Sequence, residues 1–242
     1  MTPSISFILP AYNEELLLPR ALKSVKDSLA AAKLEGEIIV VDNNSSDRTA
    51  EVAKEHGATK VVFEPVNNIS RARNAGAKAS SGEMLIFMDS DSMLSASLLE
   101  ELVSRTSSGE LCGVGAKLGF DAPLPFMAAC SVRLWNTLAP LFKIAAGSFA
   151  FCSRRAFDGC GGFDESLYAA EDVAFSRKLL RWAKRNKMRC CILSSPVVSS
   201  ARRMSSGRSW PLFLKMLPLL LMPWRLRSKS GCKMWYDHET RS

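Results

Sequence analysis

Short apolar runs alternate with helical patterns through the first 90 residues of this 242-residue chain. The apolar runs cover residues 4–10, 37–42, 60–63 and 84–88. The segments between them repeat apolar residues at helical spacing and cover residues 14–33, 48–56 and 70–79. Strands and helices that alternate at these distances predict a parallel α/β sheet with right-handed crossovers. Pro19 falls in the early turns of the first helical segment, where proline can kink a helix.

Polar residues follow the predicted strands at the points where they end. Pro10 to Glu14 follow the first strand, Asp42 ends the second, and Asp89-Ser90-Asp91 follows the fourth. In open parallel sheets ligands bind outside the carboxyl ends of the strands. We therefore expect these acidic residues to converge on one site.

Asp89 and Asp91 are one residue apart at the end of a buried strand. Carboxylates suit Mg²⁺ or Mn²⁺, which are usually held by one or two carboxylates together with substrate phosphates. The alternative is a turn or a helix cap, a common use of acidic residues after strands.

The second half of the chain is less regular. Leu111 to Leu118 and Gly147 to Cys152 are read as strands, and residues 125–145 and 171–185 as helices. The last helix opens on Glu171 and Asp172, where the helix dipole favours acidic residues.

Composition allows a sizeable core, since 47% of the residues are hydrophobic. The net charge of +8 is unevenly spread, because 16 of the 32 Lys and Arg residues but only 2 of the 24 Asp and Glu residues lie from Arg177 onward. This asymmetry predicts an anionic partner for the C-terminal part: membrane phospholipid, a diphosphate or nucleic acid. Nucleic acid is the weakest of the three, because no recognised binding module accompanies the charge.

The cysteines indicate a reducing compartment. The seven are scattered, odd in number and form no CxxC pair, which favours reduced thiols over disulfides or zinc. The first residues show no basic leader of the kind that opens a signal peptide. We therefore expect a cytoplasmic protein.

Several segments together resemble the family 2 glycosyltransferases, enzymes of the GT-A fold that use nucleotide-activated sugars. The first two are Phe7–Glu14 and Ile39–Thr49. The others are Arg71–Gly76 with Gly82-Glu83, Phe87–Asp91, and Gly161–Glu165 followed by Glu171-Asp172. They occur in the family's order over residues 4 to 190. The resemblance implies a Rossmann-like, mainly parallel α/β sheet flanked by helices. The residues beyond it predict a C-terminal amphipathic helical tail.

The resemblance also assigns the donor site. Four residues of the first loop would line the nucleoside: Pro10, Ala11, Tyr12 and Glu14. Asp42 would accept a hydrogen bond from uracil or guanine, and its alternative role is a helix cap. Glu14 has the alternative of a first-turn glutamate that the helix dipole stabilises. Arg73 would contact nucleotide or phosphate, and Arg71 is a second candidate for the same contact. The alternative for both is a position on the solvent-exposed face of a helix.

For catalysis, the resemblance makes Asp91 the direct metal ligand and lets Asp89 also contact ribose or sugar. A third ligand in the family is often a histidine, and neither His56 nor His238 is placed for it. Asp172 would be the general base that takes the acceptor hydroxyl proton, with Glu171 orienting the acceptor. One base and no covalent partner imply inversion at the anomeric carbon. Trp135 and Gly147 are candidates for the acceptor side.

The basic, apolar segment from Trp210 to Trp224 is too short and too rich in proline for a confident membrane span. Tryptophan at both ends and a basic fringe suit an interfacial segment on anionic lipid, and the alternative is a helix packed on the core. We expect a catalytic domain over residues 1–195, with a nucleotide-sugar half over 1–95 and an acceptor half over 96–195. Residues 196–242 would form an extension.

The predicted activity is metal-dependent, inverting transfer of a sugar from a nucleotide-diphosphate sugar to a glycan or lipid-linked acceptor, at the cytoplasmic face of the membrane. Two alternatives remain. One is a sugar-1-phosphate nucleotidyltransferase, which usually has a glycine-rich basic loop that Pro10 to Glu15 lack. The other is a non-catalytic nucleotide-sugar-binding protein.

Overall fold

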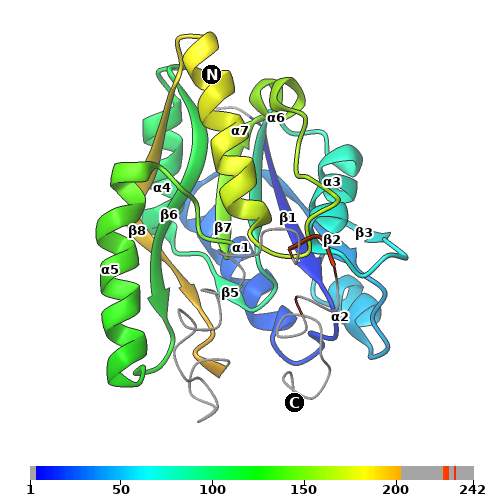
Figure 1. Ribbon diagram of the computed structural model, residues 1–242. Coiled ribbons are helices and arrows are strands. Elements are labelled where there is room, and N and C mark those ends of the chain that lie inside the picture. Colours follow the sequence, from blue (N-terminus) through cyan, green and yellow to red (C-terminus); the bar gives the residue numbers. More distant parts are fainter. Residues whose placement is uncertain (1–3, 203–225, 229–231, 233–242) are drawn as a thin grey trace.

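A mixed sheet forms the centre of the molecule in the computed structural model, which describes residues 4–202, 226–228 and 232. Its strands are β1 (Ile5–Ala11), β2 (Gly36–Asp42), β3 (Lys60–Phe63), β4 (Met84–Met88), β5 (Ser92–Met93), β6 (Leu111–Phe120), β7 (Phe149–Ser153) and β8 (Arg189–Ser199). Its helices are α1 (Leu18–Ala32), α2 (Thr49–Glu55), α3 (Ile69–Ala79), α4 (Ala96–Thr106), α5 (Phe126–Phe142), α6 (Arg154–Cys160) and α7 (Glu171–Arg185). The strand order is β3-β2-β1-β4-β7-β6-β8-β5 (Figure 1).

The N-terminal half confirms the predicted parallel arrangement. β3, β2, β1 and β4 run parallel, and β1 lies between β2 and β4. Their carboxyl ends therefore meet at one edge of the sheet, as expected from the strand pattern. The first helix begins at Leu18 rather than near Glu14, and Pro19 occupies its opening turn, so this proline starts the helix and does not kink it.

The second half of the sheet is mixed. β7 is antiparallel to β4 and to β6, β8 runs parallel to β6, and the short β5 is antiparallel to β8. Four elements were not predicted: β5, α4, α6 and β8.

β8 is hard to recognise in sequence because it is irregular. Its pairing with β6 jumps from Leu193 to Pro196, and the two residues in between donate their backbone N–H groups to Glu101 of α4 at 2.9 and 2.8 Å. A bulge of this kind accepts a proline inside a sheet. β8 also crosses residue 195, where we expected the catalytic domain to end; the division into domains stays a prediction, and the segment from Trp210 to Trp224 lies outside the described residues.

Helices cover both faces of the sheet (Figure 1). α1 and α4 pack on one face around Phe7, Leu22 and Leu98. α3, α6 and α7 pack on the other, where Ile8 and Phe87 contribute to the core. α3 lies so close to β1 and β2 that a Cβ at Gly76 would collide with Ile8 and Val41. Glycine is therefore required there, and this close approach holds the N-terminal end of α3 beside the strand ends.

Candidate active site

A cavity of about 330 Å³ lies at the carboxyl ends of β1 and β4. Nine of the ten predicted site residues line it: Pro10, Ala11, Tyr12, Glu14, Arg73, Asp89, Asp91, Glu171 and Asp172. They come from the β1 loop, α3, the β4 loop and α7. Their convergence across more than 160 residues of chain follows from the sheet topology.

Asp42 is the predicted residue that does not line the cavity. It is buried at the end of β2, and its Oδ1 accepts a hydrogen bond from the backbone N–H of Ser45 at 3.0 Å. The next residue, Asn43, lines the cavity and donates to the carbonyl oxygens of Glu64 and Val66. The contact between Asp42 and a nucleotide base stays a prediction.

Arg73 joins three walls of the cavity. Its guanidinium donates to Glu171 Oε1 at 2.7 Å, to Asp89 Oδ1 at 3.1 Å and to the carbonyl oxygen of Gly147 at 2.7 Å, and the side chain is 2% exposed. Burial by itself lowers the pKa of Arg73, but the carboxylates of Glu171, Asp89 and Asp172 raise it above its usual value. Arg73 is therefore a permanent cation that compensates the acidic cluster.

The two terminal nitrogens of Arg73 already donate hydrogen bonds to protein groups. A contact between Arg73 and a phosphate therefore stays a prediction. Its Nε is buried with no hydrogen-bond partner among the described residues. Arg71 lies outside the cavity lining, in ion pairs with Glu64 and Glu165 at 3.0 and 3.2 Å.

Asp89 and Asp91 differ in their surroundings. Asp89 Oδ1 accepts from Arg73, whereas Asp91 Oδ1 accepts from the Ser92 hydroxyl at 3.5 Å, and the Asp91 carbonyl oxygen accepts from the N–H of Ser200 at 3.2 Å. Among the described residues no three His, Cys, Asp or Glu side chains converge as a metal cluster. A pair of carboxylates nevertheless fits Mg²⁺ or Mn²⁺ when substrate phosphates and water supply the remaining oxygens.

Asp172 is half-buried in the first turn of α7, and its Oδ1 accepts the backbone N–H of Val173 at 2.7 Å. Burial, and then the negative charge of Glu171, raise the pKa of Asp172 to about 7, against the opposing effect of Arg73. A carboxylate with a pKa near neutrality accepts and releases protons readily under physiological conditions. These are the properties that a general base needs.

The raised pKa predicts how pH changes the stability of an Asp172→Asn variant. The folded state holds the Asp172 proton more tightly than the unfolded state, so this group's stabilising contribution is complete below about pH 4. It is lost as pH rises through about 7. Asparagine does not titrate, so at pH 8 the variant should be more stable than the wild type by up to about 4 kcal/mol, and the difference should vanish at pH 4. Urea unfolding at both values tests this, and equal differences at the two values would contradict it.

The loop before α7 is packed on an aromatic cluster. Phe163 stacks on Phe175 of α7 with ring centroids 4.2 Å apart and meets Phe87 of β4 edge-on at 5.0 Å. The guanidinium of Arg73 lies 5.2 Å from the Phe163 ring. The Gly-Gly-Phe-Asp motif thus fixes the start of α7 relative to the end of β4, and so positions Asp172 opposite the Asp pair.

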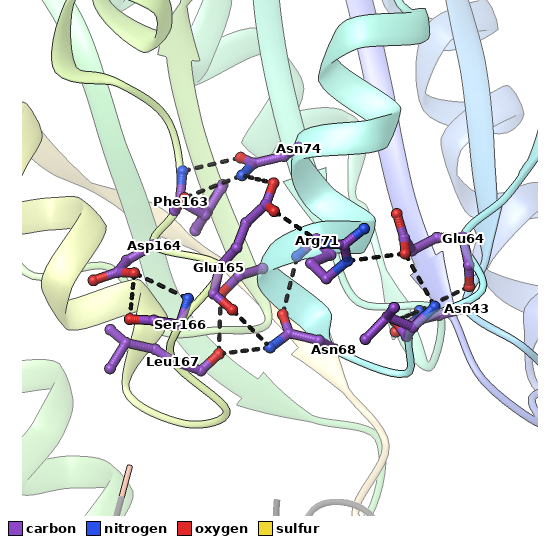
Figure 2. A network of polar contacts seen from close by, with 12 residues as sticks. Asn43, Glu64, Asn68, Arg71, Asn74, Phe163, Asp164, Glu165, Ser166 and Leu167 are labelled. Carbon is purple, nitrogen blue, oxygen red and sulfur yellow. Dashed lines mark hydrogen bonds and ion pairs between the residues drawn. The ribbon is translucent and has the colours of Figure 1, made fainter. Parts of the chain in front are cut away.

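Polar side chains of α3 hold the same loop (Figure 2). Asn74 exchanges two hydrogen bonds with the backbone of Phe163, both 3.0 Å long. Asn68, fully buried at the start of α3, donates to the carbonyl oxygens of Glu165 and Leu167 and caps the helix through Arg71 N–H. Sequence reasoning missed these anchors, although the Arg-Asn-Ala-Gly pattern marked Asn74.

Asn68→Ala should cost about 2 to 4 kcal/mol of unfolding free energy. It removes the α3 cap, worth about 1 kcal/mol, and takes the Asn68 donor from the carbonyls of Glu165 and Leu167, at about 1–3 kcal/mol, with Leu167 keeping the 3.4 Å hydrogen bond from the Ser70 hydroxyl. Ser95→Ala is the matched control, because Ser95 caps α4 through Leu98 N–H at 3.2 Å and its other hydrogen bond, of 3.1 Å with the Ser97 hydroxyl, is exposed. Guanidinium unfolding measures both, and equal losses would mean that Asn68 acts as a cap alone.

A contact from the end of the described chain was also missed. Arg202 donates from Nη2 to both carboxylate oxygens of Glu14 at 3.0 Å. Glu14 is 3% exposed and also lines the cavity. The chain that follows β8 therefore closes one side of the candidate donor site, which the basic character of the segment did not reveal.

Trp135 and Gly147 line the cavity on the side of Asp172. A Cβ at Gly147 would lie 3.5 Å from Asp172 Oδ2 and 3.8 Å from Arg73 Nη2. The indole nitrogen of Trp135 is buried without a hydrogen-bond partner among the described residues. Their role on the acceptor side stays a prediction.

Known proteins share this fold and these motifs. A mannosyltransferase from Pyrobaculum calidifontis, solved with GDP-Man and Mn²⁺, superposes with a TM-score of 0.67 at 18% identity, covering 100% of this chain and 65% of the other. Glycosyltransferase AglE of Haloferax volcanii is 34% identical over 73% of this chain and 61% of its own length. The beta-monoglucosyldiacylglycerol synthase of Trichormus variabilis is 26% identical over 74% of this chain and 42% of its own.

The fold is that of the GT-A glycosyltransferases. The sequence model described as "Glycosyl transferase family 2" matches residues 6–160. The chain belongs to this family. It spans between 24% and 61% of the length of three curated relatives that it matches.

Proposed function

We propose that the protein transfers a sugar from a nucleotide-diphosphate sugar to an acceptor hydroxyl with inversion of configuration. The observation that carries this proposal is Asp172, whose pKa is raised to about 7 in a cavity that it shares with Asp89 and Asp91. Asp172 accepts the hydroxyl proton as the acceptor oxygen forms its bond to the anomeric carbon and the bond to the nucleoside diphosphate breaks.

The donor half, residues 1–95, binds the nucleotide in this proposal. The loop from Pro10 to Glu14 lines the nucleoside, Asp42 reads the base, and Asp91 with Asp89 would hold Mg²⁺ or Mn²⁺. Such a cation stabilises the negative charge that grows on the leaving diphosphate. The Mn²⁺ in the mannosyltransferase of the same fold supports this assignment.

The acceptor half, residues 96–195, presents the hydroxyl. Glu171 orients the acceptor. Alternatively, it orients Asp89 and Asp91 through its hydrogen bond with Arg73. A lipid-linked acceptor at the cytoplasmic face of an anionic membrane fits the basic C-terminal part, and the name of one relative, a beta-monoglucosyldiacylglycerol synthase, supports it. No helix among the described residues is long and apolar enough to cross a membrane.

Transfer assays test the proposal. Radiolabelled UDP-sugars and GDP-sugars are incubated with the protein, Mn²⁺ and a membrane lipid extract, and label is followed into the organic phase. We expect one donor to label a lipid product. If folded protein that still binds nucleotide neither hydrolyses any donor nor transfers its sugar, the non-catalytic alternative would be favoured.

A further inference from the structure

The outer side of α5 carries a continuous apolar stripe. Four large side chains on it are strongly exposed: Met127 at 61%, Leu134 at 57%, Leu138 at 37% and Leu141 at 71%. Their spacing of seven, four and three residues, with exposed Cys130 between the first two, places them along one side of the helix over roughly 20 Å. Exposed apolar patches of this size mark an interaction surface.

The opposite side of α5 is anchored to the molecule. The side-chain amide of Asn136 exchanges two hydrogen bonds of 2.9 Å with the backbone of Leu118 in β6. Ala139 is buried and Trp135 lines the catalytic cavity. These contacts fix the rotation of the helix, so the exposed stripe lies on the side away from β6. The helix itself lies at the outer edge of the molecule (Figure 1).

The stretch of sequence that carries the stripe has charge of one sign, and an acidic residue near its end is Glu110, which shares a surface pocket with Pro140 and Lys143. Residues 122–157 contain no Asp or Glu, and Arg133 and Lys143 are exposed on α5 and directly after it. An apolar helical stripe with a cationic fringe is the pattern of helices that lie in the interface of an anionic membrane.

We propose that this stripe of α5 is the surface by which the protein docks on anionic lipid. Two other occupants fit less well. A second copy would bring Arg133 and Lys143 against like charges. Residues 203–225 of the same chain carry four Lys or Arg and no acidic residue, so charge gives them no preference for this face either.

Docking through α5 has a functional consequence. Leu134 lies on the stripe, and its sequence neighbour Trp135 lines the cavity. A helix is roughly 10 Å across, so the stripe and the cavity are about one helix diameter apart. A lipid-linked hydroxyl at the membrane surface would therefore be presented beside Asp172. This consequence rests on the proposed function, whereas docking itself does not need donor or transfer.

Vesicle co-sedimentation of the full chain, without nucleotide, tests the proposal. The vesicles are phosphatidylcholine alone or mixed with phosphatidylglycerol, and the variant is Leu134→Glu/Leu141→Glu. The matched control is Leu16→Glu/Phe63→Glu, which alters apolar residues that are 78% and 61% exposed elsewhere on the surface. We expect at least a tenfold weaker partition to anionic vesicles for the α5 variant alone.

Three results would overturn the proposal: no binding by the wild type, binding by the α5 variant equal to that of the wild type, or equal losses in the two double variants. A dimer that only the α5 variant loses, measured by sedimentation velocity, would assign the stripe to a second copy instead. A fluorophore on Cys130, the exposed cysteine of the stripe, gives an independent readout and should shift to the blue on anionic vesicles. The sedimentation assay contains no sugar donor, so it tests docking separately from sugar transfer. Docking can fail while the transfer activity is found, and transfer can fail while docking is found.

Discussion

Asp172→Asn should reduce sugar transfer by about 10²–10⁴-fold while leaving donor binding unchanged, because a positioned general base contributes that much to the rate. Asparagine keeps the size of the side chain and an oxygen that can accept the Val173 N–H, so the first turn of α7 is preserved. It cannot take the acceptor proton. Initial rates of transfer and the affinity for donor, measured on the same preparation, separate the two effects.

Asp164→Asn is the matched control for this variant. Asp164 belongs to the same loop, but it binds Ser166 and does not line the cavity. Transfer by this control should stay close to that of the wild type. If Asp172→Asn retained full activity, the base would lie elsewhere and the assignment of α7 to the acceptor side would fail.

The second large effect is on stability. Arg73→Ala should cost about 3–5 kcal/mol of unfolding free energy, because it leaves the buried carboxylate of Glu171 and the half-buried carboxylate of Asp89 without their cation. The loss should be larger at pH 8 than at pH 5, where uncompensated carboxylates can protonate. Denaturant unfolding at the two pH values measures it.

Arg71→Ala provides the comparison on the same helix. Arg71 also makes two ion pairs with carboxylates, but its side chain is 36% exposed, against 2% for Arg73. Exposed pairs contribute about 1 kcal/mol or less. A loss of similar size for the two arginines would show that the buried cluster does not depend on Arg73.

The donor half was predictable from sequence because its information is local. Strands β1 to β4 are continuous apolar runs, and parallel topology alone carries Glu14 and Asp89 to the same edge. α4 was also within reach, since Ser95 and the spacing of Leu98, Leu99 and Leu102 are ordinary helix signals. β8 was not, because the Ser-Ser-Pro bulge breaks its pattern and its pairing with β6 depends on residues far away.

The chemistry of the site depends on contacts that sequence spacing does not encode. The raised pKa of Asp172 results from burial and from the charge of Glu171, and it is opposed by Arg73, which is 99 residues away in the chain. Asn68 and Asn74 hold the loop before α7 across more than 85 residues. The motifs therefore identified the candidate residues, whereas the structure shows which of their charges lie close enough to affect one another.

The most direct test of the central claim is donor binding followed by thermal unfolding. Purified protein is titrated with UDP-sugars and GDP-sugars, with and without Mn²⁺, and with an Asp91→Asn variant beside the wild type. A ligand that binds the native state raises the melting temperature by mass action. We expect stabilisation by one nucleotide family, strengthened by Mn²⁺ in the wild type and not in Asp91→Asn. Folded protein that no donor stabilises, with or without the metal, would contradict the assignment of this cavity to a nucleotide sugar.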